Sequence, residues 1–339
     1  MKNKDLRSTG QWYIIICLLV FGFQSEIQAF GKTGWYATRV KFEYQYSDYN
    51  QYRYPLSLSS DPEIGFEYLN PYVTDFPEHR LLTKVQQTLG PLQSIELRHE
   101  YSELSDYKDQ HRGYLRYNRY LTDMMTLYGS FQNLNIGIND PDSSANVGGN
   151  VATAGLKYDR SGWIKGDASV SYDMSKDSNG LIISTLKPML NVRWSLNSLT
   201  ALSGRVELYR TTSDSGDFIG RAFTVVLSRY LPTQTALHAG MRVYNHDYGV
   251  KSISPTFEIG QYLRWDLSMR LRYRYFACRF DEDAVPDFIK GRSINSHSCA
   301  AEINWQMFSD IQTRFKYRRY LSDQDIKMNT YLLSLEFDV

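Results

Sequence analysis

Arginine occupies every second position in the stretch MRLRYRYF, residues 269–276, at Arg270, Arg272 and Arg274. Methionine, leucine and tyrosine fill the positions between them. A guanidinium group stays charged at physiological pH and binds carboxylates and phosphates well, so a row of arginines could attract anions. The chemistry that this stretch suggests is recognition of negative charge by one side of a segment whose other side needs an apolar medium.

Residues that could support catalysis are sparse in the chain, which has six histidines. His246 precedes Asp247 and His297 precedes Ser298, but adjacent residues on a strand point to opposite faces and cannot form an acid/base pair. The segment DSNG, residues 177–180, has no histidine nearby. The sequence has no CxxCH haem motif and no clustered metal ligands. We therefore expect no cofactor, no metal site and no enzymatic activity.

The arginine stretch must be positioned by a β-strand. A helix would scatter the arginines around its circumference, whereas a strand sorts alternate residues onto two faces. Two settings place cations on one face and apolar residues on the other. One is a basic sheet that binds nucleic acid, and the other is a membrane β-barrel with a polar lumen.

The N-terminus has the pattern of a secretory signal peptide. Lys2, Lys4 and Arg7 precede the apolar segment 12–23, and Ala29 suits the position before a cleavage site. We expect a signal peptide at residues 1–29 and a barrel domain at residues 30–339. A signal anchor is the alternative, but the apolar segment is shorter than the roughly 20 residues that a spanning helix needs.

Charge and composition favour the barrel over the nucleic-acid-binding sheet. The chain has 38 basic and 37 acidic residues, of which residues 1–29 hold three and two, so the remainder has 35 of each. A neutral exported chain is unlike a nucleic-acid-binding protein. Mean hydropathy is −0.45, and no second long apolar run follows the first. The 27 tyrosines, 16 phenylalanines and 6 tryptophans fit a chain whose strands are apolar at every second position.

Alternating segments separated by turn residues predict an all-β transmembrane antiparallel barrel of about sixteen strands, with fourteen or eighteen as alternatives. The expected strands are residues 34–46, 79–89, 92–104, 111–121, 124–137, 149–160, 163–175, 183–195, 199–211, 219–230, 234–246, 252–264, 266–278, 294–307, 310–321 and 326–339. Short connections should lie at one rim, and long polar loops at the other should include 47–78, 138–148, 212–218 and 279–293.

The C-terminal segment NTYLLSLEFDV, residues 329–339, alternates apolar and polar residues and carries Phe337 close to its end. In this it resembles the C-terminal targeting strand of bacterial outer-membrane proteins, although Asp338 and Val339 follow the aromatic residue. The related phrases beginning RYLTD at 119 and RYLSD at 319 resemble hairpins of porin-like and exopolysaccharide-associated barrels. This resemblance implies a location in the outer membrane of a Gram-negative bacterium.

Charged residues on the strands must point inward, because a charge facing lipid near the midplane costs about 2–4 kcal/mol. On the strands, basic inward residues outnumber acidic ones by about two to one, while most loop charges are acidic. The predicted pore-lining residues are Arg39, Lys41, Arg98, Arg112, Arg116, Arg205, Arg242, Arg270, Arg272, Arg274, Arg314 and Lys316. A cationic lumen favours anions, so we expect an anion-selective channel for small or polymeric solutes that works by passive diffusion.

Two alternatives to the channel stay open. An export port for an acidic exopolysaccharide would need a periplasmic partner. A closed barrel braced by arginine–glutamate ladders could act as a surface receptor or scaffold. In each case the expected partners include outer-membrane lipid, and nucleic acid is not among them.

Cys278 and Cys299 flank the acidic segment 279–293 and are the two cysteines outside the signal peptide. Their positions predict a disulfide that closes this loop in the oxidising periplasm. Separate packing of the two thiols is the alternative, because the expected strand alternation places them on opposite faces.

Overall fold

The structure is a computed structural model that describes residues 37–52, 73–104, 108–139, 144–160, 163–176, 182–213, 216–247, 249–280, 293–323 and 326–338. No helix in these residues is long and apolar enough to cross a membrane. The expected signal peptide at 1–29 lies outside the described residues.

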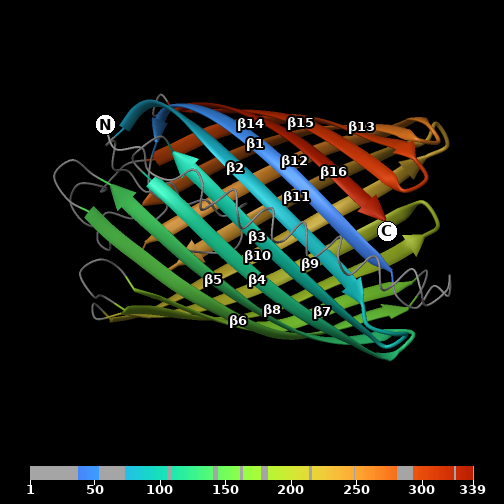
Figure 1. Cartoon of the computed structure of the whole chain (residues 1–339), viewed down its shortest axis with the longest axis horizontal. Helices are drawn as coiled ribbons and strands as arrows, with labels where there is room; N and C mark the ends of the chain where they lie inside the picture. Colours follow the sequence, from blue (N-terminus) through green and yellow to red (C-terminus); the bar gives the residue numbers. More distant parts are fainter. Residues whose placement is uncertain are drawn as a thin grey trace, which may run out of the picture.

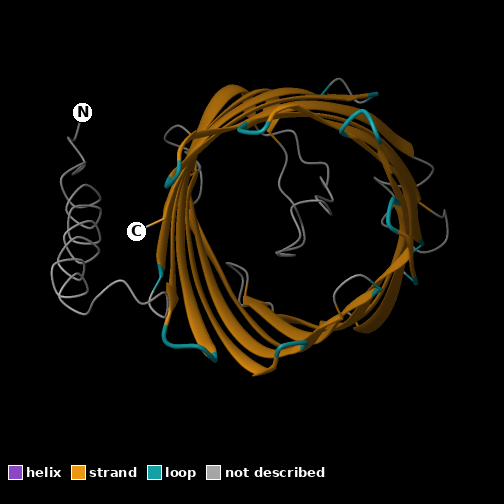
Figure 2. Cartoon of the chain, turned by 90° about the vertical axis from the view of Figure 1, so that its right-hand side faces the viewer, coloured by secondary structure: helices purple, strands orange, loops and turns teal. Residues whose placement is uncertain are grey.

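Sixteen antiparallel strands form a closed barrel in which each strand pairs with its neighbours in sequence and β1 pairs with β16 (Figures 1 and 2). This confirms the predicted fold class and strand number. The strands are β1 (Thr38–Tyr52), β2 (Val73–Thr88), β3 (Gln93–Leu104), β4 (Lys108–Thr122), β5 (Met125–Asn139), β6 (Ser144–Arg160), β7 (Ile164–Lys176), β8 (Ile182–Asn197), β9 (Thr200–Ser213), β10 (Gly216–Leu231), β11 (Thr235–His246), β12 (Val250–Arg264), β13 (Leu267–Phe280), β14 (Ser293–Phe308), β15 (Ile311–Ser322) and β16 (Lys327–Asp338).

Each even-numbered strand from β2 to β14 is joined to the next strand by a connection of two to four residues. These connections lie at the barrel end that also holds the start of β1 and the end of β16, on the right in Figure 1. We call this end the short-turn rim. The other end, the long-loop rim, includes the 20-residue connection 53–72 and the 12-residue connection 281–292. The rim asymmetry therefore follows the prediction in outline.

Strands reach further toward the long-loop rim than the sequence pattern predicts. β2 begins at Val73 instead of residue 79, and β1 continues to Tyr52. The predicted long loop at 212–218 is wrong, because Ser213 pairs directly with Gly216. Gly216 has a φ of +127°, a backbone conformation that glycine adopts without a steric penalty. Two residues therefore separate β9 from β10.

Candidate channel interior

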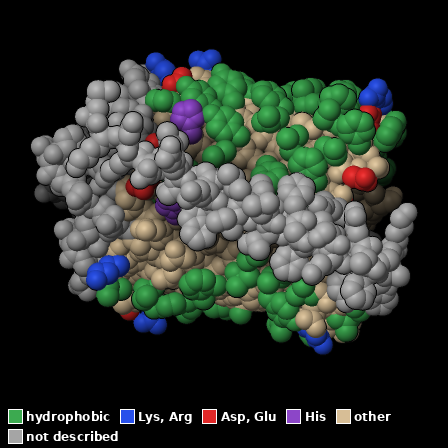
Figure 3. Space-filling model, viewed as in Figure 1, with side chains coloured by type: hydrophobic (Ala, Val, Ile, Leu, Met, Phe, Trp, Pro, Cys, Tyr) green, Lys and Arg blue, Asp and Glu red, His purple; other side chains and the backbone are tan. Residues whose placement is uncertain are grey.

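Apolar and polar residues alternate along each strand, and this alternation separates an outer from an inner face. On β9, Leu202, Val206 and Leu208 are 37–46% exposed, whereas the intervening Glu207 is fully buried among polar neighbours. Apolar side chains cover most of the visible outside of the barrel in Figure 3, with lysine and arginine near its two ends. An exterior of this kind suits lipid, and the charged face is the inner one.

Aromatic residues mark both edges of the apolar exterior. Exposed rings near the short-turn rim belong to Trp163, Trp194, Tyr262, Trp265, Trp305 and Phe308. Toward the long-loop rim, His79 contacts the rings of Tyr44 and Tyr46, and Tyr331 contacts those of Tyr46 and Tyr317. Girdles of amphipathic rings lie at membrane–water interfaces, so the two belts bracket the part of the barrel that faces hydrocarbon.

Glu207 of β9 is the centre of the first charged cluster on the inner wall. Its Oε1 lies 2.7 Å from Arg205 Nη2 and 3.2 Å from Lys187 Nζ, and its Oε2 lies 2.6 Å from Arg242 Nη1. Arg242 also donates a hydrogen bond to the hydroxyl of Tyr209 at 3.3 Å. Three cations from β8, β9 and β11 therefore share one carboxylate, which we call the Glu207 cluster.

Glu100 of β3 is the centre of a second cluster and is 2% exposed. Arg98 Nη2 lies 2.6 Å from its Oε2, and Arg80 Nε and Arg112 Nη1 lie 3.5 and 3.8 Å from its Oε1. Three strands, β2, β3 and β4, supply these cations. The carboxylate thus ties three neighbouring strands together on the inner face.

Glu43 of β1 extends this second cluster toward β15. Lys41 Nζ lies 2.7 Å from Glu43 Oε2, and Arg314 Nη2 approaches the same oxygen at 3.5 Å. Arg80 lies 3.9 Å from Glu43 and so stands between the two carboxylates. We call the whole group the Glu43–Glu100 cluster.

The two clusters lie on opposite walls of the barrel. In the ring of sixteen strands, β9 is eight strands from β1 and six from β3. Glu100 and Glu207 are also at similar heights, since each is seven residues past the first residue of a strand that begins at the short-turn rim. Both clusters hold more cations than anions, so positive charge faces the lumen from two sides.

The arginine row of β13 lies between the clusters on one side. Arg270 Nε is 3.3 Å from Glu258 on β12, and Arg270 Nη1 is 4.0 Å from Glu302 on β14. Arg274 donates a hydrogen bond of 2.6 Å to the hydroxyl of Ser254. No carboxylate interrupts the row within its own strand, but the neighbouring strands supply two.

All twelve predicted pore-lining residues lie on the inner face, on alternate positions from the exposed apolar residues of their strands. Arg39 is at the short-turn rim, where it pairs with Asp338 at 2.6 Å. Arg116 lies 4.1 Å from the centre of the Tyr128 ring. Sequence analysis missed Arg80, although its even number puts it on the same face as Lys84, because residue 80 lies at the very edge of the expected strand.

The predicted disulfide between Cys278 and Cys299 is wrong. Both thiols are free, with Cys278 buried and Cys299 exposed. Cys278 pairs with Ile294, and Cys299 pairs with Tyr273 on the outer face. Cys299 lies five positions after Ile294, which corresponds to about 17 Å along β14 and is beyond the reach of a disulfide.

His297 and Ser298, one of the two pairs rejected above, lie on opposite faces of β14. His297 contacts the ring of Tyr273 on the outer face. Ser298 pairs with Arg274 on the inner face. Among the described residues, no group of three or more His, Cys, Asp or Glu side chains could hold a metal ion.

Comparison of whole structures relates this barrel to several outer-membrane proteins. OccAB3 from Acinetobacter baumannii matches with a TM-score of 0.53 at 8% identity, over 90% of this chain and 99% of the other. A bacterial polysaccharide outer membrane secretin matches with a TM-score of 0.53 at 11% identity, over 88% of this chain and 98% of the other. OccK7 (OpdD) from Pseudomonas aeruginosa matches with a TM-score of 0.50 at 11% identity, over 91% of this chain and 99% of the other.

The chain has the closed antiparallel β-barrel fold of these proteins. The similarity is one of fold, since identity does not exceed 11% in these three matches. No protein-family model matches the sequence, and no curated protein is similar to it. The activity of this barrel must therefore be argued from its own inner wall.

Proposed function

We propose that this barrel is an outer-membrane channel that passes anionic solutes by passive diffusion. The observation that carries the proposal is the excess of positive charge in the two clusters on opposite walls. Five cations surround Glu43 and Glu100, which leaves a formal excess of three. Three cations surround Glu207, which leaves an excess of two.

This fixed charge acts on ions that pass between the walls. Screening reduces the field over a Debye length of about 8 Å at physiological ionic strength, so part of the field reaches the lumen from each side. A cationic lining lowers the energy of an anion there and raises that of a cation. The carboxylates keep the guanidinium groups in place without neutralising them, because each carboxylate has more than one cationic partner.

The competing interpretation is a closed barrel in which the clusters only brace the wall. The same contacts support it, since Arg242 and Arg80 each tie strands together. Ion conduction distinguishes the two, because a braced and closed barrel does not conduct.

The deciding experiment is the reversal potential of the purified, refolded protein in a planar bilayer with a tenfold KCl gradient. We expect a potential of the sign that indicates chloride preference. Repeating the gradient at concentrations near 1 M should reduce the preference, because the Debye length falls to about 3 Å. Absence of conductance contradicts the proposal and favours the receptor or scaffold role, whereas a preference for potassium contradicts the selectivity for anions.

Export of an acidic polysaccharide is a second candidate, since one of the structural neighbours is a polysaccharide outer membrane secretin and a cationic wall would suit an acidic polymer. Such a role would require a periplasmic partner to deliver the polymer. Acidic oligosaccharides of increasing length, added on one side of the bilayer, test it. If the duration of each current block increases with the length of the oligosaccharide, the barrel offers a path for a polymer. If only monosaccharides block the current, the path admits small solutes.

A further inference from the structure

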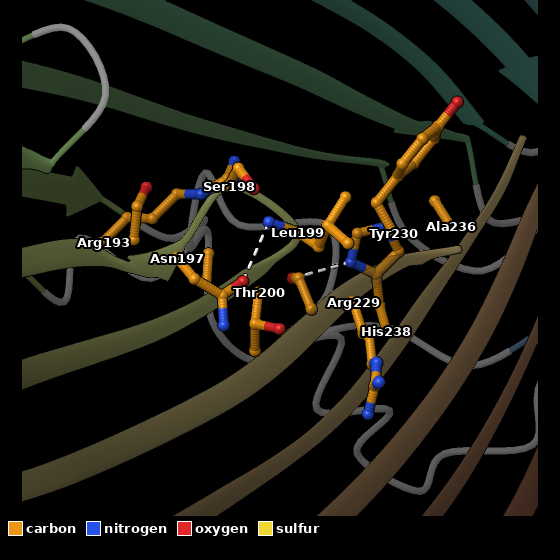
Figure 4. A pocket seen from close by; sticks show the side chains of 12 residues that line it. Arg193, Asn197, Ser198, Leu199, Thr200, Arg229, Tyr230, Ala236 and His238 are labelled. Atoms are coloured by element: carbon orange, nitrogen blue, oxygen red, sulfur yellow. Dashed lines mark hydrogen bonds between the residues drawn. The ribbon is translucent and has the colours of Figure 1, made fainter. Parts of the chain in front are cut away.

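A small hollow lies on the inner wall at the short-turn rim, between the β8–β9 turn and the β10–β11 hairpin. It encloses about 180 Å³ and is shown in Figure 4. Arg193 and Asn197 lie on one side of it, and Tyr230 and His238 on the other. These residues come from the ends of three strands, so the hollow is built from rigid elements.

The hollow exists because small side chains meet there. Ala201 pairs with Ser195 on β8 and with Ser228 on β10, and Ala236 pairs with Tyr230. This row of serine, alanine and serine leaves a depression in the inner wall.

The hollow opens toward the lumen. The residues that alternate with its lining are Trp194, Leu202 and Leu227, and these are 37–50% exposed on the outer face. They are not among the lining residues. A solute inside the barrel could therefore reach the hollow without crossing the lipid-facing surface.

Arg193 supplies a positive charge at the edge of the hollow. Its cross-strand partners are Lys165 on β7 and Ser203 on β9, and within the described part of the chain no carboxylate forms an ion pair with it. Lys165, by contrast, is paired with Asp159 at 2.7 Å. The exposed guanidinium of Arg193 is thus available to a carboxylate that enters the lumen.

Arg229 is a second cation of the lining, next to Tyr230, and His238 and Ser228 supply neutral hydrogen-bonding groups. His238 Nδ1 lies 2.7 Å from Ser228 Oγ, as the dashed line in Figure 4 marks. This contact fixes the imidazole and leaves its second nitrogen for another partner. Ser195 adds a hydroxyl and Tyr230 an aromatic ring.

We propose that the hollow binds one sugar-acid unit, a compact solute that carries a carboxylate and several hydroxyls. Arg193 would pair with the carboxylate, while Ser228, His238 and Ser195 would exchange hydrogen bonds with hydroxyls. An apolar carboxylate would leave these polar groups without hydrogen-bond partners, and a neutral sugar would lack the ion pair with Arg193. The inference rests on the proposed function, in which anions enter the lumen, and it identifies sugar acids as one class of those anions.

Isothermal titration of the folded full-length protein in detergent tests this site without requiring conduction. The probes are glucuronate, glucose and butyrate. We expect saturable binding of glucuronate, with glucose and butyrate weaker by about tenfold or more, which corresponds to about 1.4 kcal/mol. Arg193→Gln should weaken glucuronate binding, and the double change Arg193→Gln with Arg229→Gln should reduce the affinity to that of glucose. Ala201→Leu should remove binding of both by filling the hollow.

Lys165→Gln is the matched control, because it removes a neighbouring cation outside the hollow and should leave glucuronate affinity within about twofold. If Ala201→Leu does not refold, Ser228→Val takes its place and should weaken binding of glucuronate and glucose alike. Equal affinity for glucuronate and glucose in the wild type, or an unchanged affinity in Arg193→Gln, overturns the site. Chloride preference in the bilayer with no glucuronate binding contradicts the site alone, whereas glucuronate binding by a non-conducting barrel contradicts only the channel.

Discussion

Arg242 on β11 reaches across β10 to Glu207 on β9, with 2.6 Å between Nη1 and Oε2. Thr224 of β10, which pairs in register with Arg242 on one side and Arg205 on the other, lies 3.4 Å from the same nitrogen. One ion pair therefore links three consecutive strands on the inner wall. Because Glu207 is fully buried, this link contributes to stability as well as to the charge of the lumen.

Glu207→Gln should destabilise the barrel by about 3 kcal/mol or more, because it leaves three partly buried cations around an uncharged amide. Urea unfolding, followed by the loss of heat-modifiable migration on a gel, measures this effect. Asp159→Asn is the control, since its ion pair with Lys165 is half exposed and should contribute less than about 1 kcal/mol. Equal effects of the two changes would show that Glu207 has no bracing role.

Replacing Arg270, Arg272 and Arg274 together by glutamate should shift the reversal potential toward cation preference, because the local charge changes from +3 to −3. The new carboxylates would also face Glu258 and Glu302, so a triple change to glutamine serves as a milder second variant. Glutamine should reduce the chloride preference without reversing it. The control exchanges Leu271 and Tyr273, which face outward, for other apolar residues. If the glutamate variant folds and keeps the wild-type reversal potential, the three arginines stabilise the barrel wall and do not set ion selectivity.

Neighbouring residues of β5 test which face meets lipid. Phe131 is 48% exposed on the outer face near the middle of its strand. Phe131→Arg should cost about 2–4 kcal/mol of folding free energy in a bilayer. Gln132→Arg should be tolerated, because Gln132 faces inward and has a side-chain nitrogen without a hydrogen-bond partner. Refolding yields into lipid vesicles at increasing urea compare the two, and similar losses would contradict the assigned alternation.

The strand number and the inward face could be predicted because both follow from alternation, which lipid imposes on each strand separately. The strand ends could not, because beyond the membrane both faces are polar. Residues 108–110, Lys-Asp-Gln, belong to β4 and yet show no apolar position. Pairing with β3 and β5 holds them in the sheet.

The partners of the inner charges could not be predicted either. Arg270 is near Glu258 and Glu302 only because of the register between β12, β13 and β14. That register depends on irregular pairing near the short turns, such as the shift between Tyr262 and Arg264. A sequence pattern within one strand contains no information about such a shift, so it could not predict that these two carboxylates lie beside the arginine row.

The two cysteines provide a test of the register between β13 and β14. Cys299 is exposed on the outer face and Cys278 is buried, so a membrane-permeant maleimide should modify Cys299 first in the folded protein. After denaturation, both thiols should react equally with or without prior reduction, because no disulfide joins them. Mass spectrometry counts the modified thiols, and Cys299→Ser identifies which cysteine reacts first. Thiols that become reactive only after reduction would show that the strands pair in a different register and that the loop 281–292 is closed by a disulfide.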